Sequence, residues 1–219
     1  MVDSRFITFE GGEGTGKSTQ VARLRDRLRA AGVPCRITRE PGGSPFAEDL
    51  RQFILSPHRP AHSALAEAML FSAARSDHLE MTIRPALADG TWVICDRFAD
   101  STRAYQGAAG GLPEDVVLQL ESMTIGCTRP DLTIILDLPV STAFARVAKR
   151  TTDALGYGNQ CDPYEGRHTE FHEALRQGFL MIAAKEATRC QVIDASPSAE
   201  AVAEMVWQAV CTRFSEVNS

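Results

Sequence analysis

One loop near the start of the chain constrains the fold more than any other feature. Residues 11–18 read G-G-E-G-T-G-K-S and match the phosphate-binding pattern G-x-x-x-x-G-K-[ST]. In such a loop, successive backbone N–H groups point inward toward an anion, and glycine permits the close approach and the turns with positive φ. The pattern therefore predicts a loop that holds the phosphates of a nucleotide.

The flanking residues supply the context that this loop requires. Residues 5–10, R-F-I-T-F-E, are β-branched and aromatic, which is typical of a buried strand. After the loop, apolar residues recur at helical spacing and a glycine ends the run: Val21, Leu24, Leu28, Ala31 and Gly32. Strand, loop and helix together favour a nucleotide site over an accidental glycine-rich turn.

Two side chains of the loop have predicted roles, and a third raises a question. Lys17 is expected to reach the β- and γ-phosphates, and Ser18 offers a hydroxyl to Mg²⁺. Glu13 places a carboxylate in a loop that has to bind an anion. The whole candidate cofactor-binding segment comprises Gly11, Gly12, Glu13, Gly14, Thr15, Gly16, Lys17, Ser18 and Thr19.

Composition limits the class of protein. The 219 residues predict one domain that spans residues 1–219. A net charge of −5 gives no global attraction to nucleic acid or to an anionic membrane, and no run approaches the ~18 apolar residues of a membrane span. The first strand begins too early to leave room for a signal peptide, and the six cysteines form no C-x-x-C pair. We therefore expect a cytoplasmic protein with reduced thiols.

Strand-like and helical segments alternate along the chain. The strand-like runs are residues 5–10, 34–39, 91–96, 132–138 and 191–194. The helical runs are residues 17–31, 47–55, 64–88, 114–125, 140–150, 165–187 and 198–214. This alternation predicts the α/β class, with a doubly wound parallel sheet and helices on both faces. Ligands should then gather at the carboxyl ends of the strands.

A second polar group follows the third strand-like run. Asp96 ends the run, where it either helps hold Mg²⁺ or caps the following segment. The residues after it make a poor core and a good polar pocket: Arg97, Ser101, Thr102, Tyr105 and Gln106. Arginine suits a phosphate because it donates two parallel hydrogen bonds.

Other segments leave two interpretations open. Phe71 and Arg75 lie four residues apart, either to stack on and hydrogen-bond a base or as a core phenylalanine beside a solvated arginine. Residues 151–161 are polar, and form either a surface loop or a lid over phosphates. His168 and His172 have the spacing of metal ligands on a helix, although nothing nearby in the sequence completes such a site.

Four segments in order carry a resemblance to a known family. They are F-E-G-G-E-G-T-G-K-S-T, T-R-E-P-G-G, F-S-A-A-R and D-R-F-A-D-S-T-R-A-Y-Q-G. Together they resemble the bacterial type of thymidylate kinase, a P-loop nucleoside monophosphate kinase, over nearly the whole chain. The resemblance implies a five-stranded sheet, a homodimer packed through helices, and Mg²⁺-dependent phosphoryl transfer from ATP to dTMP in dTTP synthesis.

The resemblance also implies roles for the acceptor residues. Phe71 would stack on thymine, while Arg75 and Gln106 would hydrogen-bond its edge. Arg97, helped by Arg51, would bind the dTMP phosphate, and Tyr105 would crowd the position of a ribose 2′-hydroxyl. The remaining pocket residues would be Ser101, Thr102, Glu40 and Pro41. Glu13 would turn away from the ATP phosphates and accept a hydrogen bond from the dTMP 3′-hydroxyl, or join the water shell of the metal.

A loop with Glu13 in place of a basic residue adds no positive charge to the transferring phosphoryl group, so we expect a lid at about residues 146–167 to supply it. Many bacterial relatives carry an arginine where this chain has Pro163. Arg150 is therefore our first candidate for the catalytic lid arginine, followed by Arg167 and Arg146.

Three other functions would share part of this pattern. A kinase for another nucleotide or a deoxynucleoside shares the loop, but a nucleoside acceptor would need a general base and would leave Arg97 without a phosphate. A GTPase switch should carry an N-K-x-D guanine reader, which the sequence lacks. An ATP-driven assembly protein would lack the D-R…A-Y-Q-G segment.

Overall fold

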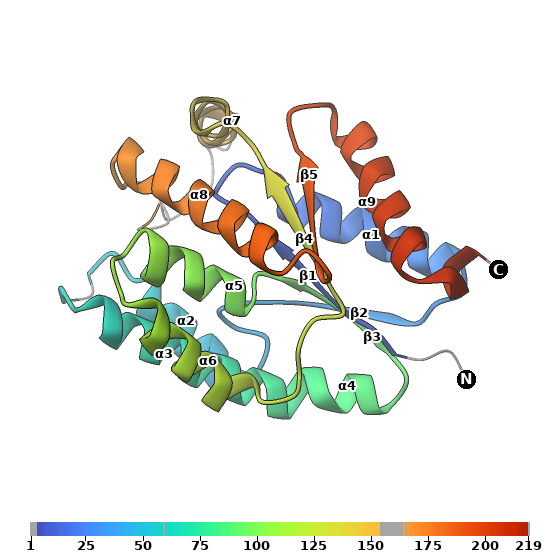
Figure 1. Cartoon of the computed structure of the whole chain (residues 1–219), viewed down its shortest axis with the longest axis horizontal. Coiled ribbons are helices and arrows are strands. Elements are labelled where there is room, and N and C mark those ends of the chain that lie inside the picture. The colour runs from blue at the N-terminus through green and yellow to red at the C-terminus, as the bar shows by residue number, and fades with distance from the viewer. Residues whose placement is uncertain (1–3, 59, 154–163, 165, 219) are drawn as a thin grey trace.

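The computed structural model describes residues 4–58, 60–153, 164 and 166–218. Its centre is a five-stranded sheet in the order β2-β3-β1-β4-β5 (Figure 1). The strands are β1 (Phe6–Glu10), β2 (Cys35–Arg39), β3 (Trp92–Asp96), β4 (Leu132–Asp137) and β5 (Cys190–Asp194). Every neighbouring pair is parallel, which confirms the predicted doubly wound α/β sheet.

Burial follows the position of each strand in the sheet. All five residues of β1, the central strand, are buried, which explains its run of large apolar side chains. The outer strands β2 and β5 are buried only at their first and fourth residues, because each has a neighbour on one side. The sheet therefore places the carboxyl end of β1, and the loop after it, at the middle of the molecule.

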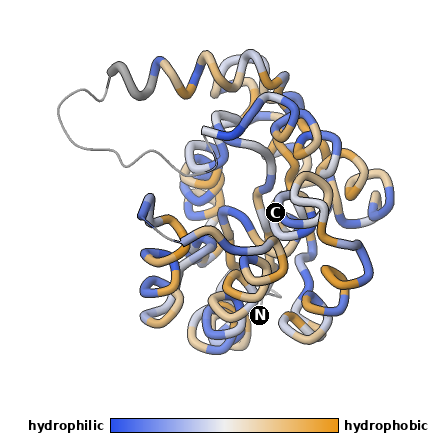
Figure 2. Tube along the Cα trace, turned by 90° about the vertical axis from the view of Figure 1, so that its left-hand side faces the viewer, coloured by the Kyte–Doolittle hydropathy of each residue, from blue (hydrophilic) through white to orange (hydrophobic). Residues whose placement is uncertain are grey.

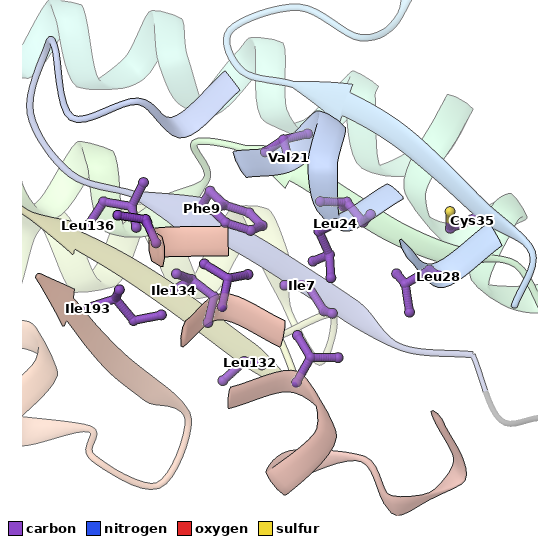
Figure 3. Packing of buried hydrophobic residues seen from close by; sticks show 14 of the residues in the cluster. Ile7, Phe9, Val21, Leu24, Leu28, Cys35, Leu132, Ile134, Leu136 and Ile193 are labelled. Carbon is purple, nitrogen blue, oxygen red and sulfur yellow. The ribbon is translucent and has the colours of Figure 1, made fainter. Parts of the chain in front are cut away.

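Two long helices cover one face of the sheet, α1 (Lys17–Ala30) and α9 (Ala199–Arg213) (Figure 1). Val21, Leu24 and Leu28 recur every three or four residues, so one stripe of α1 faces the sheet. Figure 3 shows these side chains packed toward Ile7 and Phe9 of β1. This contact anchors the start of α1, and with it the preceding loop.

A second group of helices covers the other face (Figure 1). They are α3 (Ala64–His78), α4 (Arg84–Ala88), α6 (Glu114–Ile125) and α8 (Thr169–Lys185), with α2 (Pro45–Ile54) packed against α3. Figure 2 shows hydrophilic and hydrophobic residues interspersed along the helical turns of the chain, as expected where one side of a helix faces the core. Among the described residues, no helix is both long and apolar enough to cross a membrane.

The predicted helix at residues 64–88 is continuous but changes its hydrogen-bonding pattern. A π-helical turn, η1 (Leu79–Ile83), joins α3 to α4. Pro85, in the first turn of α4, has no N–H to donate and its ring crowds the carbonyl four residues before it. The wider π turn accommodates this proline inside the helix.

The polar segment after β3 was not predicted to be helical, and that omission was wrong. It forms α5 (Ala99–Thr102) and a π-helical turn, η2 (Arg103–Ala108). Its buried positions include Asp100, Thr102 and Gln106, so no apolar stripe marks it as a helix in the sequence. Helix α7 (Val140–Asp153) also runs three residues beyond its predicted end, and a short 3₁₀ turn, η3 (Ser215–Asn218), ends the described chain.

Candidate active site

The loop between β1 and α1 requires glycine at two positions with positive φ. Gly11 has φ 132°, and a Cβ there would lie 2.5 Å from the carbonyl oxygen of Leu136. Gly14 has φ 72°, and a Cβ there would lie 2.6 Å from the carbonyl oxygen of Ala143. Any larger residue would push the loop away from the end of β4 and the start of α7, so the loop conformation depends on both glycines.

Lys17 lies inside the loop that precedes it. Its Nζ donates to the carbonyl oxygens of Gly11 at 3.0 Å and Gly12 at 2.7 Å. Burial, followed by the positive charge of Arg97, lowers the pKa of Lys17 to about 8. The ammonium is thus partly desolvated and held where the phosphates of a nucleotide would replace its carbonyl partners.

Ser18 and Asp96, the two residues expected to hold Mg²⁺, lie in direct contact. The Ser18 hydroxyl donates to Asp96 Oδ2 at 2.6 Å, across the gap between α1 and the end of β3. A hydroxyl and a carboxylate are oxygen ligands of the kind that Mg²⁺ accepts alongside water and phosphate. No group of three or more His, Cys, Asp and Glu side chains that could hold a metal occurs within the described parts of the chain. The pair therefore fits a metal that is bound mainly through a nucleotide.

Glu13 faces the polar segment after β3. Its Oε1 accepts hydrogen bonds from the Tyr105 hydroxyl and from Arg97 Nη2, the latter at 3.1 Å. Burial opposes the ionisation of Glu13, but the charges of Arg97 and Lys17 and the Tyr105 hydrogen bond outweigh it and lower the pKa of Glu13. The carboxylate therefore lies with Arg97 and Tyr105, the residues expected on the acceptor side.

Arg97 is held in an unusual backbone conformation. Its φ of 69° lies in the left-handed region, which costs a side-chain-bearing residue free energy and tends to occur at functional sites. Its guanidinium donates to the Gly11 carbonyl oxygen at 3.0 Å and the Ser101 hydroxyl at 3.3 Å, and lies 4.9 Å from the Tyr105 ring centroid. The side chain is still 20% exposed, so it can reach a bound anion.

Glu10, which sequence reasoning missed, fixes this conformation from the end of β1. Its carboxylate accepts from the Phe98 backbone N–H at 2.8 Å and from the Ser101 hydroxyl at 2.6 Å. Burial, followed by the charge of Asp100, raises the pKa of Glu10 to about 8, although Ser101, Arg97 and Phe98 oppose this shift. The available sequence signal was an acidic residue at the end of an apolar strand-like run, directly before the loop.

Arg75 is buried rather than solvated, so the solvated alternative was wrong. Its side chain is 2% exposed, and its Nε donates to Glu40 Oε2 at 2.7 Å. Its Nη2 donates to the Phe98 carbonyl oxygen and the Thr102 hydroxyl, both at 3.1 Å. His78 Nδ1 lies 3.1 Å from the other Glu40 oxygen. Two helices and the turn after β2 thus fix the guanidinium before any ligand binds.

Gln106 is fixed in the same way by residues that the sequence did not indicate. Its Nε2 donates to Glu67 Oε2 at 2.9 Å and to the Tyr164 hydroxyl at 3.3 Å. Half-buried Phe71 packs against the same apolar cluster as Tyr105 and Tyr164. The structure therefore brings Phe71 of α3 and Tyr105 of η2 to the same aromatic and apolar cluster, and the contact with Glu67 holds the Gln106 amide against α3.

Arg51 supports the turn at the edge of this pocket. Its Nη1 donates to the carbonyl oxygen of Pro41 at 2.7 Å, and the peptide bond between Glu40 and Pro41 is cis. The contact holds Arg51 against the turn that contains Glu40 and Pro41, which the family resemblance assigns to the sugar and phosphate side.

Comparison with known proteins agrees with this geometry. The thymidylate kinase family model matches residues 9–206. The thymidylate kinase of Bradyrhizobium diazoefficiens is 51% identical over 96% of this chain and 90% of its own length. The thymidylate kinase of Rhodopseudomonas palustris is 50% identical over 97% of this chain and 90% of its own. The chain belongs to the thymidylate kinase family.

A solved thymidylate kinase also shares the fold. The crystal structure of the Ehrlichia chaffeensis enzyme superposes with a TM-score of 0.75 and 31% sequence identity, covering 94% of this chain and 98% of that one. Membership of the thymidylate kinase family makes this chain a phosphotransferase that converts dTMP to dTDP. The rival functions, a GTPase switch and an assembly ATPase, are thereby excluded.

The segment expected to act as a lid, residues 146–167, is only partly described. The side chain of Arg150 and the whole of Pro163 lie outside the described residues. The two other lid candidates both have partners: Arg146 Nη2 donates to the Ser196 carbonyl oxygen at 3.2 Å, and the Arg167 guanidinium lies 4.5 Å from the Phe171 ring centroid and 4.9 Å from that of Tyr164.

Proposed function

We propose that this chain transfers the γ-phosphoryl group of ATP, bound with Mg²⁺ in the loop of residues 11–19, to dTMP bound between Phe71, Arg75 and Arg97. The observation that carries this proposal is the contact of Glu13 with Arg97 and Tyr105. Glu13 belongs to the loop proposed to hold the donor; its partner Arg97 lies in the turn between β3 and α5, and its partner Tyr105 lies in η2. The two halves of the site therefore meet at a charged contact rather than lying on separate surfaces.

The donor half would act through position and charge. Lys17 would contact the β- and γ-phosphates, and Ser18 and Asp96 would hold Mg²⁺ through their oxygens. The metal supplies charge that offsets the negative charge of the transferring group. A general base is unnecessary, because a phosphate monoester with a second pKa of ~6 is already largely ionised at neutral pH.

The acceptor half would be pre-organised. The Arg75 guanidinium and the Gln106 amide are already fixed by buried partners, so a thymine ring stacked on Phe71 would meet polar groups that need little further ordering. Tyr105, held by its hydroxyl against Glu13, would crowd a ribose 2′-hydroxyl. Arg97 and Arg51 would bind the dTMP phosphate, with Ser101, Thr102, Glu40 and Pro41 around them.

The lid would supply the positive charge that the loop lacks because it carries Glu13 in place of a basic residue. Arg150 remains our proposed catalytic lid arginine, on the sequence argument that Pro163 replaces the arginine found in many bacterial relatives. Arg146 and Arg167 are the alternatives, and both would have to leave the contacts described above.

A proton measurement tests the donor half. Lys17 has a pKa of about 8 in the free protein, and the phosphates of ATP should raise it because they restore a favourable partner for the ammonium. Calorimetry in buffers of different ionisation enthalpy should then show uptake of about half a proton from this group at pH 8, and almost none at pH 6. ATP affinity should fall as the pH rises above about 8.

The matched control is Lys17→Arg, because a guanidinium stays protonated throughout this range. Its proton uptake at pH 8 should be lower than that of the wild type by the Lys17 contribution. Equal uptake by the two proteins would remove Lys17 from the donor site.

We further propose that two copies pair through α2, α3 and α6, in the cytoplasm, where both substrates would be available. These helices expose large apolar side chains, which on a monomer favour association: Phe46, Phe53, Leu65, Met69, Leu118 and Met123. Light scattering at micromolar concentration should give twice the 23.9 kDa mass of one chain. A mass of one chain would contradict the homodimer.

A further inference from the structure

One oxygen of Glu13 is not used by the contacts described above. Oε1 accepts from Tyr105 and Arg97, whereas Oε2 is buried and has no hydrogen-bond partner among the described residues. His172 Nδ1 of α8 lies 3.7 Å from Oε2, which is too long for a hydrogen bond. His172 Nε2 is likewise buried without a partner in the described part of the chain. Both side chains are largely buried, at 9% and 5% exposure.

A small cavity lies beside this pair. It has a volume of about 30 Å³ and is lined by Glu13 and His172 together with residues from the end of β4 and from α7, among them Asp137 and Phe144. A water needs roughly 10–15 Å³ and two to four polar partners. The cavity can therefore hold a water that contacts both Glu13 and His172, since two atoms 3.7 Å apart can each lie within hydrogen-bond distance of the same oxygen.

The other charged groups around this cavity already have partners. Arg176 Nε and Nη2 donate to the two carboxylate oxygens of Asp137 at 2.7 and 2.8 Å, so these opposite charges satisfy each other. The His172 ring is fixed by edge-on contacts with Phe144 of α7, at 4.9 Å between centroids, and with Phe171 at 5.6 Å. His172 is thus the polar group available to Oε2, and its ring has little freedom to turn away.

We propose that His172 is a positioning residue of the active site, which holds Oε2 of Glu13 through a water bound in this cavity. Arg97 and Tyr105 hold one oxygen of the carboxylate and His172 the other, so the carboxylate keeps one orientation during phosphoryl transfer. Because Phe144 lies on the helix that leads into the lid, the same histidine links that helix to the acceptor side. This inference rests on the role proposed for Glu13.

The test is a double-mutant cycle with a conservative rescue. His172→Leu keeps the side-chain volume but removes both ring nitrogens, and it should lower kcat for dTMP phosphorylation by about 10-fold with the ATP KM within about two-fold, because misplaced catalytic groups lose rate. His172→Asn, whose amide can reach the position of Nδ1, should return kcat to within about three-fold of the wild type. When Glu13 is first changed to glutamine, His172→Leu should cost less than about two-fold.

Two kinetic results would overturn the proposal. One is an equal loss for His172→Leu and His172→Asn, which would mean that only ring packing matters. The other is the same fold-loss from His172→Leu with and without Glu13→Gln. A wild-type crystal structure at high resolution adds a direct check, since the water should lie within hydrogen-bond distance of both side chains and its absence would also overturn the proposal. If Glu13→Gln itself turned over normally while His172→Leu did not, the role proposed for Glu13 would fail as well.

Discussion

Lys17→Ala is expected to lower kcat for dTMP phosphorylation by about 10³-fold, while dTMP binding changes little. The Lys17 ammonium lies inside the loop, 2.7 Å from the Gly12 carbonyl oxygen, where it would contact the transferring phosphoryl group. Loss of one pre-organised stabilising donor typically costs ~10²–10³ in rate. We expect the upper end of that range, since the chain has no second basic residue in the loop.

Steady-state kinetics measure the loss of kcat, and calorimetry measures the binding of dTMP and of ATP separately. Lys185→Ala is the matched control, because that lysine is exposed and its Nζ pairs with Glu114 at 2.6 Å on the surface. A Lys17→Ala enzyme with near-normal turnover, or one that lost dTMP and ATP binding equally, would contradict the donor-site assignment.

Arg97→Gly should lower kcat/KM for dTMP by about 10³-fold. Glycine adopts the φ of 69° without strain, so this variant removes the guanidinium and relieves the backbone at once. The loss follows because Glu13 would remain as a largely buried carboxylate beside the acceptor phosphate, and removal of one partner of a buried charge pair costs ~3–5 kcal/mol. The affinity for ATP alone should change much less.

Arg97→Lys and a thermal melt are the controls for this variant. Lysine keeps the charge but cannot make the paired contacts with Gly11 and Glu13, so it should recover only part of the loss. If Arg97→Gly instead kept its kcat/KM for dTMP and only changed its melting temperature, the strained backbone would serve stability alone.

The fold was predictable because its signals are local. The three inner strands are short runs rich in apolar and β-branched residues, and the nucleotide loop is a contiguous pattern whose glycines the structure requires at Gly11 and Gly14. The prediction failed at α5 and η2, where burial of Asp100 and Gln106 depends on partners far away in the sequence. Asp100, for example, pairs with Arg189 at 2.7 Å. No periodicity reveals a helix whose inner face is polar.

The site was predictable only in part, for the same reason. Residues at or just after strand ends, such as Asp96 and Arg97, could be predicted as site residues because parallel strands end at one edge of the sheet. The residues that orient the site side chains were missed, because each contacts a partner 30 or more positions away in the sequence. Glu10 contacts Ser101, Glu67 contacts Gln106, and His78 contacts Glu40. Such pairings arise from packing, which a single sequence does not display.

Phosphorylation rates of the four deoxynucleoside monophosphates, measured with the wild-type chain at fixed ATP and Mg²⁺, test the central claim most directly. In the proposed site a thymine would stack on the Phe71 ring and meet the buried Arg75 guanidinium and the fixed Gln106 amide, so kcat/KM for dTMP should exceed that of the other three by at least about 10²-fold. Comparable rates for all four, or a preference for a purine nucleotide, would contradict the acceptor site described here.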